Sequence, residues 1–176
     1  QPTDPGIFGQ ALIGLHASAD PDISEMEHLE FTALRPGIIK VLSFHNPDDI
    51  EKLASNHPGA SWIVRAFLSF GGRNISPQQF LKDTISDVNR TLDKLKGKEV
   101  VVELHNEPNL KSEGLGSSWI DGRSFSNWWL ELLILYRKEL PQVKFIYPGL
   151  SPGSTVNGFK IDHIRFIEAS RHADEQ

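Results

Sequence analysis

Short apolar runs alternate with helical patterns along the whole chain, and this alternation limits the possible folds more than any other feature. The runs are rich in branched and aromatic residues, which is typical of strands that are buried on both faces. They cover residues 11–16, 38–44, 62–69, 99–105 and 144–147. Helical patterns fall between and after them, over residues 23–34, 47–56, 76–97, 124–140 and 159–170. Five βα units in a row predict an α/β fold with a parallel sheet.

The third helix has the clearest signals. Ser76 can cap its N-terminus, Pro77 suits its first position, and Gln79 can complete a capping box. Gly97 offers a stop at the other end.

Composition excludes several classes of function. The chain has 176 residues, a formal net charge of −5 and no cysteine. We therefore expect a single domain over residues 1–176, without disulfides or thiolate chemistry. No cluster of basic residues or long apolar stretch predicts binding to nucleic acid or a membrane, and no glycine-rich motif predicts a nucleotide cofactor.

Polar residues stand where the predicted strands end. In parallel α/β folds, ligands bind at the carboxyl ends of the strands, so these residues are candidates for a site. They are His16, His45, His105, Asn106, Glu107 and Tyr147.

The segment from Val100 to Asn109 is the densest of these. Three valines predict a buried strand, which delivers Asn106 and Glu107 to the rim before Pro108 ends the pairing. A carboxylic acid there can exchange a proton with a substrate, and the amide beside it can hydrogen-bond a substrate hydroxyl.

This segment resembles the fourth-strand signature of the retaining (β/α)8 glycoside hydrolases that include cellulases, β-mannanases and β-xylosidases. In that clan Asn-Glu-Pro closes the fourth strand. The resemblance implies that Glu107 is the acid/base and that Asn106 holds the 2-hydroxyl of the sugar. It also implies an oligosaccharide or polysaccharide substrate, no metal or cofactor, and a TIM-barrel fold of which only about five βα units are present. A polysaccharide substrate favours an extracellular location.

The chain departs from the clan in two ways. His105 replaces the aromatic residue that often precedes the Asn-Glu pair, so the wall of the site is expected to differ. Retention also needs a second carboxylate as nucleophile, about 5 to 5.5 Å from the first. The clan supplies it from a seventh strand, for which 176 residues are too few. We therefore expect the N-terminal part of a barrel that is inactive alone, with a missing C-terminal half or self-association to close the sheet.

Other residues have predicted roles around the motif. Trp119, in a glycine-rich loop, could stack on a sugar ring or anchor the loop. Glu113 and Asp121, in the same loop, could approach the cleft, but a position facing solvent is the favoured expectation. Lys40 and Arg65 are unusual within apolar strands and would be costly there without partners. Pairing with Glu103 inside the barrel is the simplest explanation.

Two other functions stay open. A non-catalytic scaffold that binds glycans or a protein would also fit a chain without a nucleophile. A metal-dependent TIM-barrel hydrolase would use His16, His45, His105 and Glu107, since imidazole and carboxylate suit zinc, manganese or iron. The histidines do not form a His-x-His or His-x-x-x-His pair, which counts against the metal enzyme.

Overall fold

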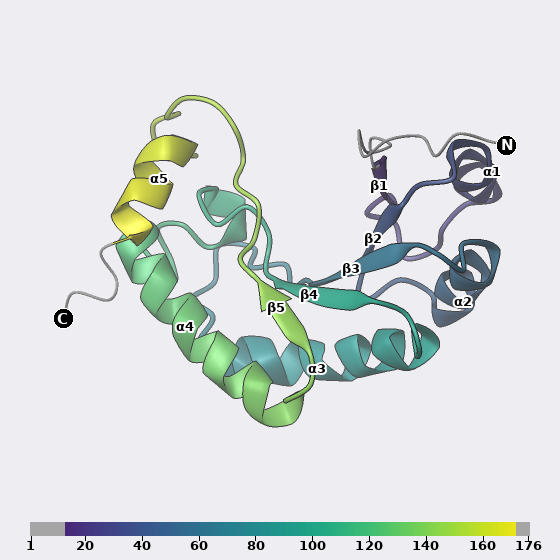
Figure 1. The fold of residues 1–176 in the computed structure, drawn as a ribbon. Helices are drawn as coiled ribbons and strands as arrows, with labels where there is room; N and C mark the ends of the chain where they lie inside the picture. The colour runs from purple at the N-terminus through teal and green to yellow at the C-terminus, as the bar shows by residue number, and fades with distance from the viewer. Residues whose placement is uncertain (1–12, 172–176) are drawn as a thin grey trace, which may run out of the picture.

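The computed structural model describes residues 13–171, which form an α/β structure of alternating strands and helices (Figure 1). The strands are β1 (Gly14–His16), β2 (Ile38–Leu42), β3 (Ser61–Ala66), β4 (Val100–Leu104) and β5 (Lys144–Ile146). The helices are α1 (Glu25–Leu34), α2 (Pro47–Asn56), α3 (Pro77–Lys94), α4 (Gly122–Glu139) and α5 (His163–Ser170), with a 3-10 turn at Lys111–Glu113. The predicted element order is therefore confirmed; residues 11 and 12 of the first predicted strand lie outside the described part.

All strands run parallel in one sheet, in the order β1-β2-β3-β4-β5. Each strand thus pairs with its neighbours in the sequence, as successive βα units produce. Figure 1 shows the sheet curving, with helices along its convex side and the strand-to-helix loops gathered at one edge. This edge carries the carboxyl ends of the strands and hence the motif that follows β4.

Side-chain caps fix where the helices begin. Ser24 and Glu27 form a capping box at α1, and Asn46 accepts a hydrogen bond from the backbone of Asp48 at α2. Ser76 caps α3 as predicted, but the Gln79 side chain bonds Asp83 and leaves the predicted box half formed. Within residues 13–171, no helix combines the length and apolar content needed to cross a membrane.

The two faces of the sheet differ sharply in polarity. Side chains of β2, β3 and β4 alternate, and those facing the helices are buried: Ile39, Val41, Trp62, Val64, Ala66, Val102 and Leu104. The opposite, concave face carries His16, Lys40, Arg65 and Glu103. Lys40 and Arg65 are partly exposed, so the prediction of strands buried on both faces is wrong for β2 and β3 in the described part of the chain.

The contact between α4 and α5 allows a direct test of packing. Gly122 opens α4 against the backbone of α5, and a Cβ there would lie 1.9 Å from the Phe166 carbonyl oxygen. We expect Gly122→Ala to push the helices apart and to lower the free energy of unfolding by about 2 kcal/mol, measured by chemical denaturation. Gly59→Ala is the matched control, because a Cβ at Gly59 meets nothing within 4 Å. Equal stability of the two variants would contradict this packing.

Candidate functional site

A buried carboxylate organises the concave face of the sheet. Glu103 on β4 accepts a hydrogen bond from Arg65 Nε at 2.7 Å and forms an ion pair with Lys40. Its other oxygen accepts from the backbone N–H of Gly149, after β5, at 3.1 Å. The predicted pairing of Lys40, Arg65 and Glu103 is thus present, and it ties β2, β3, β4 and the loop after β5 together.

The surroundings of Glu103 keep it ionised. Burial alone would raise its pKa, but the hydrogen bonds and charges of Arg65 and Lys40 outweigh burial and hold the pKa below its ordinary value. Glu103 is therefore a fixed negative charge beneath the rim. Because this carboxylate is fully engaged, its role is structural.

The chain leaves β4 in an unusual backbone conformation. His105 has a φ of 80° and Glu107 a φ of 30°, in the left-handed region that residues other than glycine rarely adopt. His105 and Pro108 are buried, whereas Asn106 and Glu107 are half-buried at the rim. Strained backbone of this kind is concentrated at functional sites, where the surrounding structure maintains it.

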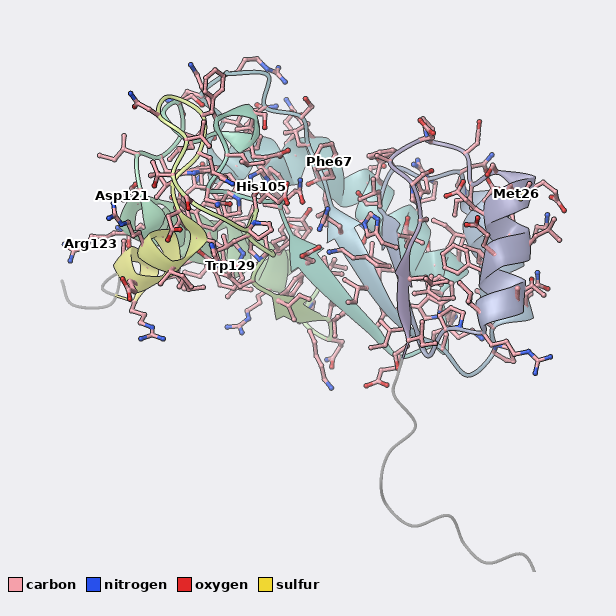
Figure 2. All side chains as sticks on the ribbon, turned by 90° about the horizontal axis from the view of Figure 1, so that it is seen from above. Met26, Phe67, His105, Asp121, Arg123 and Trp129 are labelled. Carbon is pink, nitrogen blue, oxygen red and sulfur yellow. The ribbon has the colours of Figure 1, made fainter. Side chains whose placement is uncertain are left out.

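Aromatic packing holds His105 in place. The position of this residue just beyond β4 is labelled in Figure 2. Its ring is fully buried, and burial lowers its pKa to about 3, so it is neutral near pH 7. Its Nε2 lies 2.8 Å from the Glu113 carbonyl oxygen, which fixes the ring as a donor there. Ring centroids within 6.0 Å of it belong to Phe70, Phe80, Trp119, Phe125 and Trp128. His105 is therefore a packing residue, and its ring has no exposed surface for the substrate contact that was predicted.

Trp119 belongs to the same aromatic cluster. Its indole is 2% exposed, and Nε1 donates to the Pro108 carbonyl oxygen at 2.7 Å. No face of the ring is open for a sugar, so the expected stacking position is not what the structure shows. The hydrogen bond from Trp119 to Pro108 instead stabilises the turn that carries Asn106 and Glu107.

Glu113 is the residue that sequence reasoning missed. It was expected in solvent, but its Oε1 lies 3.3 Å from Asn106 Nδ2 and its Oε2 is buried without a partner. Burial raises its pKa, and the charge of Glu107 adds to that rise. The sequence does carry a signal: Gly114, with a φ of 118°, leaves no room for a Cβ, which would lie 2.6 Å from Trp119. Only glycine allows the loop to turn Glu113 back toward the motif.

Asn106, Glu107 and Glu113 therefore form the candidate site, which we call the rim cluster. Within residues 13–171, no hydrogen bond from another protein group occupies the Glu107 carboxylate, which leaves it free to interact with a ligand. The charge of Glu107 raises the pKa of Glu113 and opposes the lowering of the Lys40 pKa by burial, which links the cluster electrostatically to the ion pairs of the concave face.

The remaining predicted site residues divide into exposed and packed ones. His16 is exposed on the concave face, where desolvation and then the charges of Arg65 and Lys40 lower its pKa to about 4. His45 is buried, accepts from the Leu42 N–H at Nδ1 and donates from Nε2 to the Ser18 carbonyl oxygen. Its predicted role in substrate binding is replaced by one in fixing two loops.

Tyr147 points to the helix side of the sheet. Its ring packs on Phe125 and Trp129, and its hydroxyl lies 3.2 Å from Ser170 Oγ of α5. The side chain is thus on the opposite face from the rim cluster, because residues alternate along and just beyond β5.

Asp121 also has a structural role, since it caps α4 (Figure 2).

Asn109 fastens the rim to the loop after β5. It is fully buried; Nδ2 donates to the carbonyl oxygens of Ser151 and Ile161, and Oδ1 accepts from the Ser151 N–H. These bonds hold the loops after β4 and β5 at a fixed separation.

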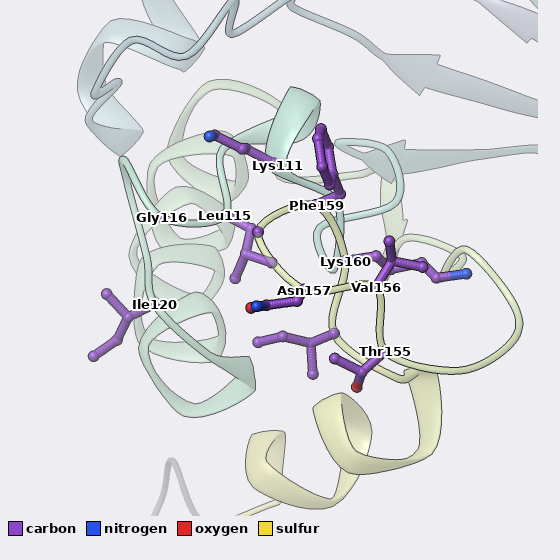
Figure 3. A pocket seen from close by; sticks show the side chains of 11 residues that line it. Lys111, Leu115, Gly116, Ile120, Thr155, Val156, Asn157, Phe159 and Lys160 are labelled. Carbon is purple, nitrogen blue, oxygen red and sulfur yellow. The ribbon is translucent and has the colours of Figure 1, made fainter.

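A cavity of about 420 Å³ lies between these two loops (Figure 3). Its wall includes Leu115, Ile120, Val156 and Phe159, and the last three are exposed. Neither Asn106 nor Glu107 lines it, so the cavity is separate from the rim cluster.

The described residues do not support the metal-dependent alternative. No group of three or more His, Asp or Glu side chains within 13–171 is arranged to hold a metal ion. His45 and His105, two of the expected ligands, are committed to backbone carbonyl groups.

Comparison with known proteins adds no family assignment: no family model matches the chain, and no curated protein or solved structure shows significant similarity to it.

The ion pairs of Glu103 predict a specific dependence of stability on pH. We expect Glu103→Gln to lower the free energy of unfolding at pH 7 by about 3 kcal/mol, because Lys40 and Arg65 lose the charge between them. A carboxyl whose pKa is lowered by folding stabilises the protein above its ordinary pKa of 4.5, and this contribution disappears as the pH falls. The wild type should therefore lose more stability below pH 4.5 than the variant does in denaturation at several pH values.

Glu99→Gln is the control for this measurement, since the exposed side chain of Glu99 accepts a hydrogen bond from Ser61 Oγ at the surface. Its stability should stay within about 0.5 kcal/mol of the wild type. Identical pH profiles for Glu103→Gln and the wild type would refute the stabilising role of Glu103.

The contacts of Asn109 predict a local effect. Asn109→Ala removes three hydrogen bonds and should lower the free energy of unfolding by about 3 kcal/mol, at about 1 kcal/mol each. Hydrogen exchange of the Ser151 amide should accelerate. Asn157→Ala changes an exposed residue of the same loop and should leave both measurements unaltered. Slow exchange at Ser151 in Asn109→Ala would show that other contacts hold the loop.

Proposed function

We propose that this chain provides the acid/base part of an O-glycoside hydrolase site, built on a (β/α)8-type barrel of which it supplies five units. The observation that carries the proposal is the rim cluster: an unpartnered carboxylate, Glu107, and an amide, Asn106, presented together by strained backbone at the end of the fourth parallel strand. Supporting it, the Asn-Glu-Pro motif stands at this position in the clan that the sequence resembles.

In the proposed reaction, Glu107 in its protonated form donates its proton to the glycosidic oxygen as the bond to the anomeric carbon breaks. A second carboxylate attacks that carbon and forms a covalent glycosyl intermediate. Glu107, now ionised, accepts a proton from water, and the water oxygen displaces the carboxylate with overall retention. Asn106 hydrogen-bonds a hydroxyl of the sugar that is being transferred.

The nucleophile must come from outside the described part of the chain. Glu103 is tied to Lys40 and Arg65 and has no free oxygen. Glu113 has one oxygen facing Asn106 and the other buried, so neither reaches a sugar from the opposite side. The proposal therefore requires further strands, from additional sequence or another molecule, that close the barrel over the concave face.

A non-catalytic glycan-binding scaffold is the second candidate. The engagement of Glu103 by Lys40 and Arg65 and the burial of Glu113 favour it, because a rim with an amide and one free carboxylate can bind sugar hydroxyls without cleaving a bond. The two candidates differ in whether Glu107 transfers a proton.

An external nucleophile separates these candidates with the 176-residue chain itself. Azide can take the place of the second carboxylate: its nitrogen bonds to the anomeric carbon, the C–O bond breaks, and Glu107 protonates the departing phenoxide. We expect no cleavage of aryl glycosides by the chain alone. With azide, we expect slow release of phenol and formation of a glycosyl azide from at least one member of a panel that covers both anomers.

Leaving-group dependence identifies the acid. Glu107→Gln should reduce azide-dependent cleavage about 100-fold for phenols of high pKa, and hardly at all for dinitrophenol, which departs without a proton. Glu168→Gln, on the exposed side of α5, is the matched control and should behave as the wild type. Oligosaccharide binding without azide-dependent cleavage would favour the scaffold instead. Azide-dependent cleavage unaffected by Glu107→Gln would rule out Glu107 as the acid.

A further inference from the structure

We propose that Glu113 is a positioning residue of the rim cluster, which holds the Asn106 carboxamide in one orientation and stands beside Glu107 as a second, non-nucleophilic carboxyl group. This inference rests on the proposed function, in which Asn106 faces the substrate. It adds a role for the loop after β4, and it concerns a residue outside the Asn-Glu-Pro motif.

Two contacts fix the backbone around Glu113. Its carbonyl oxygen accepts from His105 Nε2 at 2.8 Å, so the residue before Asn106 and the residue seven positions after it are joined directly. The next residue, Gly114, packs so closely on Trp119 and Phe70 that no Cβ fits. Glu113 is therefore held at the rim by the same aromatic cluster that maintains the strained turn.

The contact between Glu113 and Asn106 selects one orientation of the carboxamide. An ionised carboxylate only accepts hydrogen bonds, so Glu113 Oε1 pairs with the Nδ2 amide and not with the Oδ1 oxygen. The Asn106 carbonyl oxygen is then left to accept a hydrogen bond from a sugar hydroxyl. Without Glu113, the amide could rotate and present either group.

Burial and neighbouring charges act on the Glu113 carboxyl group in opposite directions. Burial raises its pKa above the ordinary 4.5, Glu107 raises it further, and the hydrogen bond from Asn106 and the charge of Arg65 oppose the rise. His105 adds no charge near neutral pH because its ring stays neutral. The charge of Glu107 thus acts on Glu113, and a proton on Glu113 reverses the preference of the Asn106 amide.

The side-chain amide of Asn106 therefore reports the state of Glu113. In an NMR titration of the 176-residue chain, we expect the Asn106 amide resonances to shift with a midpoint above 4.5, together with the carboxyl carbon of Glu113. Glu107→Gln should lower that midpoint, because it removes the neighbouring charge. In Glu113→Gln, which keeps an acceptor for Nδ2, this transition should vanish while the other amide resonances stay in place.

Glu168→Gln is again the control, and it should leave the Asn106 transition unchanged. Two results would overturn the inference: an Asn106 amide that does not follow Glu113, or an Asn106 transition that survives in Glu113→Gln. If Glu113→Gln fails to fold, the change of midpoint in Glu107→Gln decides the question instead, and an unmoved midpoint overturns the coupling. Failure of azide-dependent cleavage is a separate result, because it tests Glu107 chemistry without involving the Asn106 titration.

Discussion

The hydrogen bond between His105 and the Glu113 carbonyl oxygen, made inside a cluster of aromatic rings, is the contact on which the rim depends. It forces the chain to leave β4 through a left-handed residue and then to fold the following loop back over the turn. A left-handed histidine is unfavourable by itself. Here the ring gains burial and a hydrogen bond that an extended strand would not provide. The same geometry leaves Asn106 and Glu107 at the surface.

Stability and chemistry are divided between the two faces of the sheet. The apolar side chains that face the helices supply most of the buried area, and the concave face carries charges that neutralise one another around Glu103. A buried ion pair adds little net stability compared with apolar packing, but it strongly disfavours loss of one partner. The Lys40–Arg65–Glu103 group therefore acts mainly to fix the register of neighbouring strands beneath the rim. The charge of Glu107 at the rim also acts on Lys40 of this group.

The order of elements and the parallel sheet could be predicted from the sequence because local signals specify them. Asn46 and Pro47 fix the start of α2, and its predicted bounds, 47–56, are the observed ones. Four strands, β2 to β5, were predicted to end too late, since apolar residues such as Phe44 and Phe67 continue past the sheet into the turns. A run of apolar residues indicates burial, but it does not indicate where the hydrogen bonds between strands end.

The site could be predicted only for residues that follow a single strand and for residues whose buried charges must be paired. Asn106 and Glu107 follow from the end of β4, and the pairing of Lys40, Arg65 and Glu103 follows from the cost of unpaired buried charge. The orientation of Trp119, His45 and Tyr147 depends on tertiary packing, which residue type alone does not reveal.

The position of Glu113 also depends on tertiary packing that the sequence does not reveal. Its approach to Asn106 requires the turn at Gly114, the position of Trp119 and the left-handed His105 together. These contacts lie within one loop, but they follow no helical or strand repeat that a sequence pattern would reveal. A loop carboxylate that looks solvent-exposed in the sequence is thus brought to half-burial by neighbours that were each assigned another role. The strongest constraint on the rim cluster lies in the aromatic packing beneath it, so changes in that packing alter the site without touching Asn106 or Glu107.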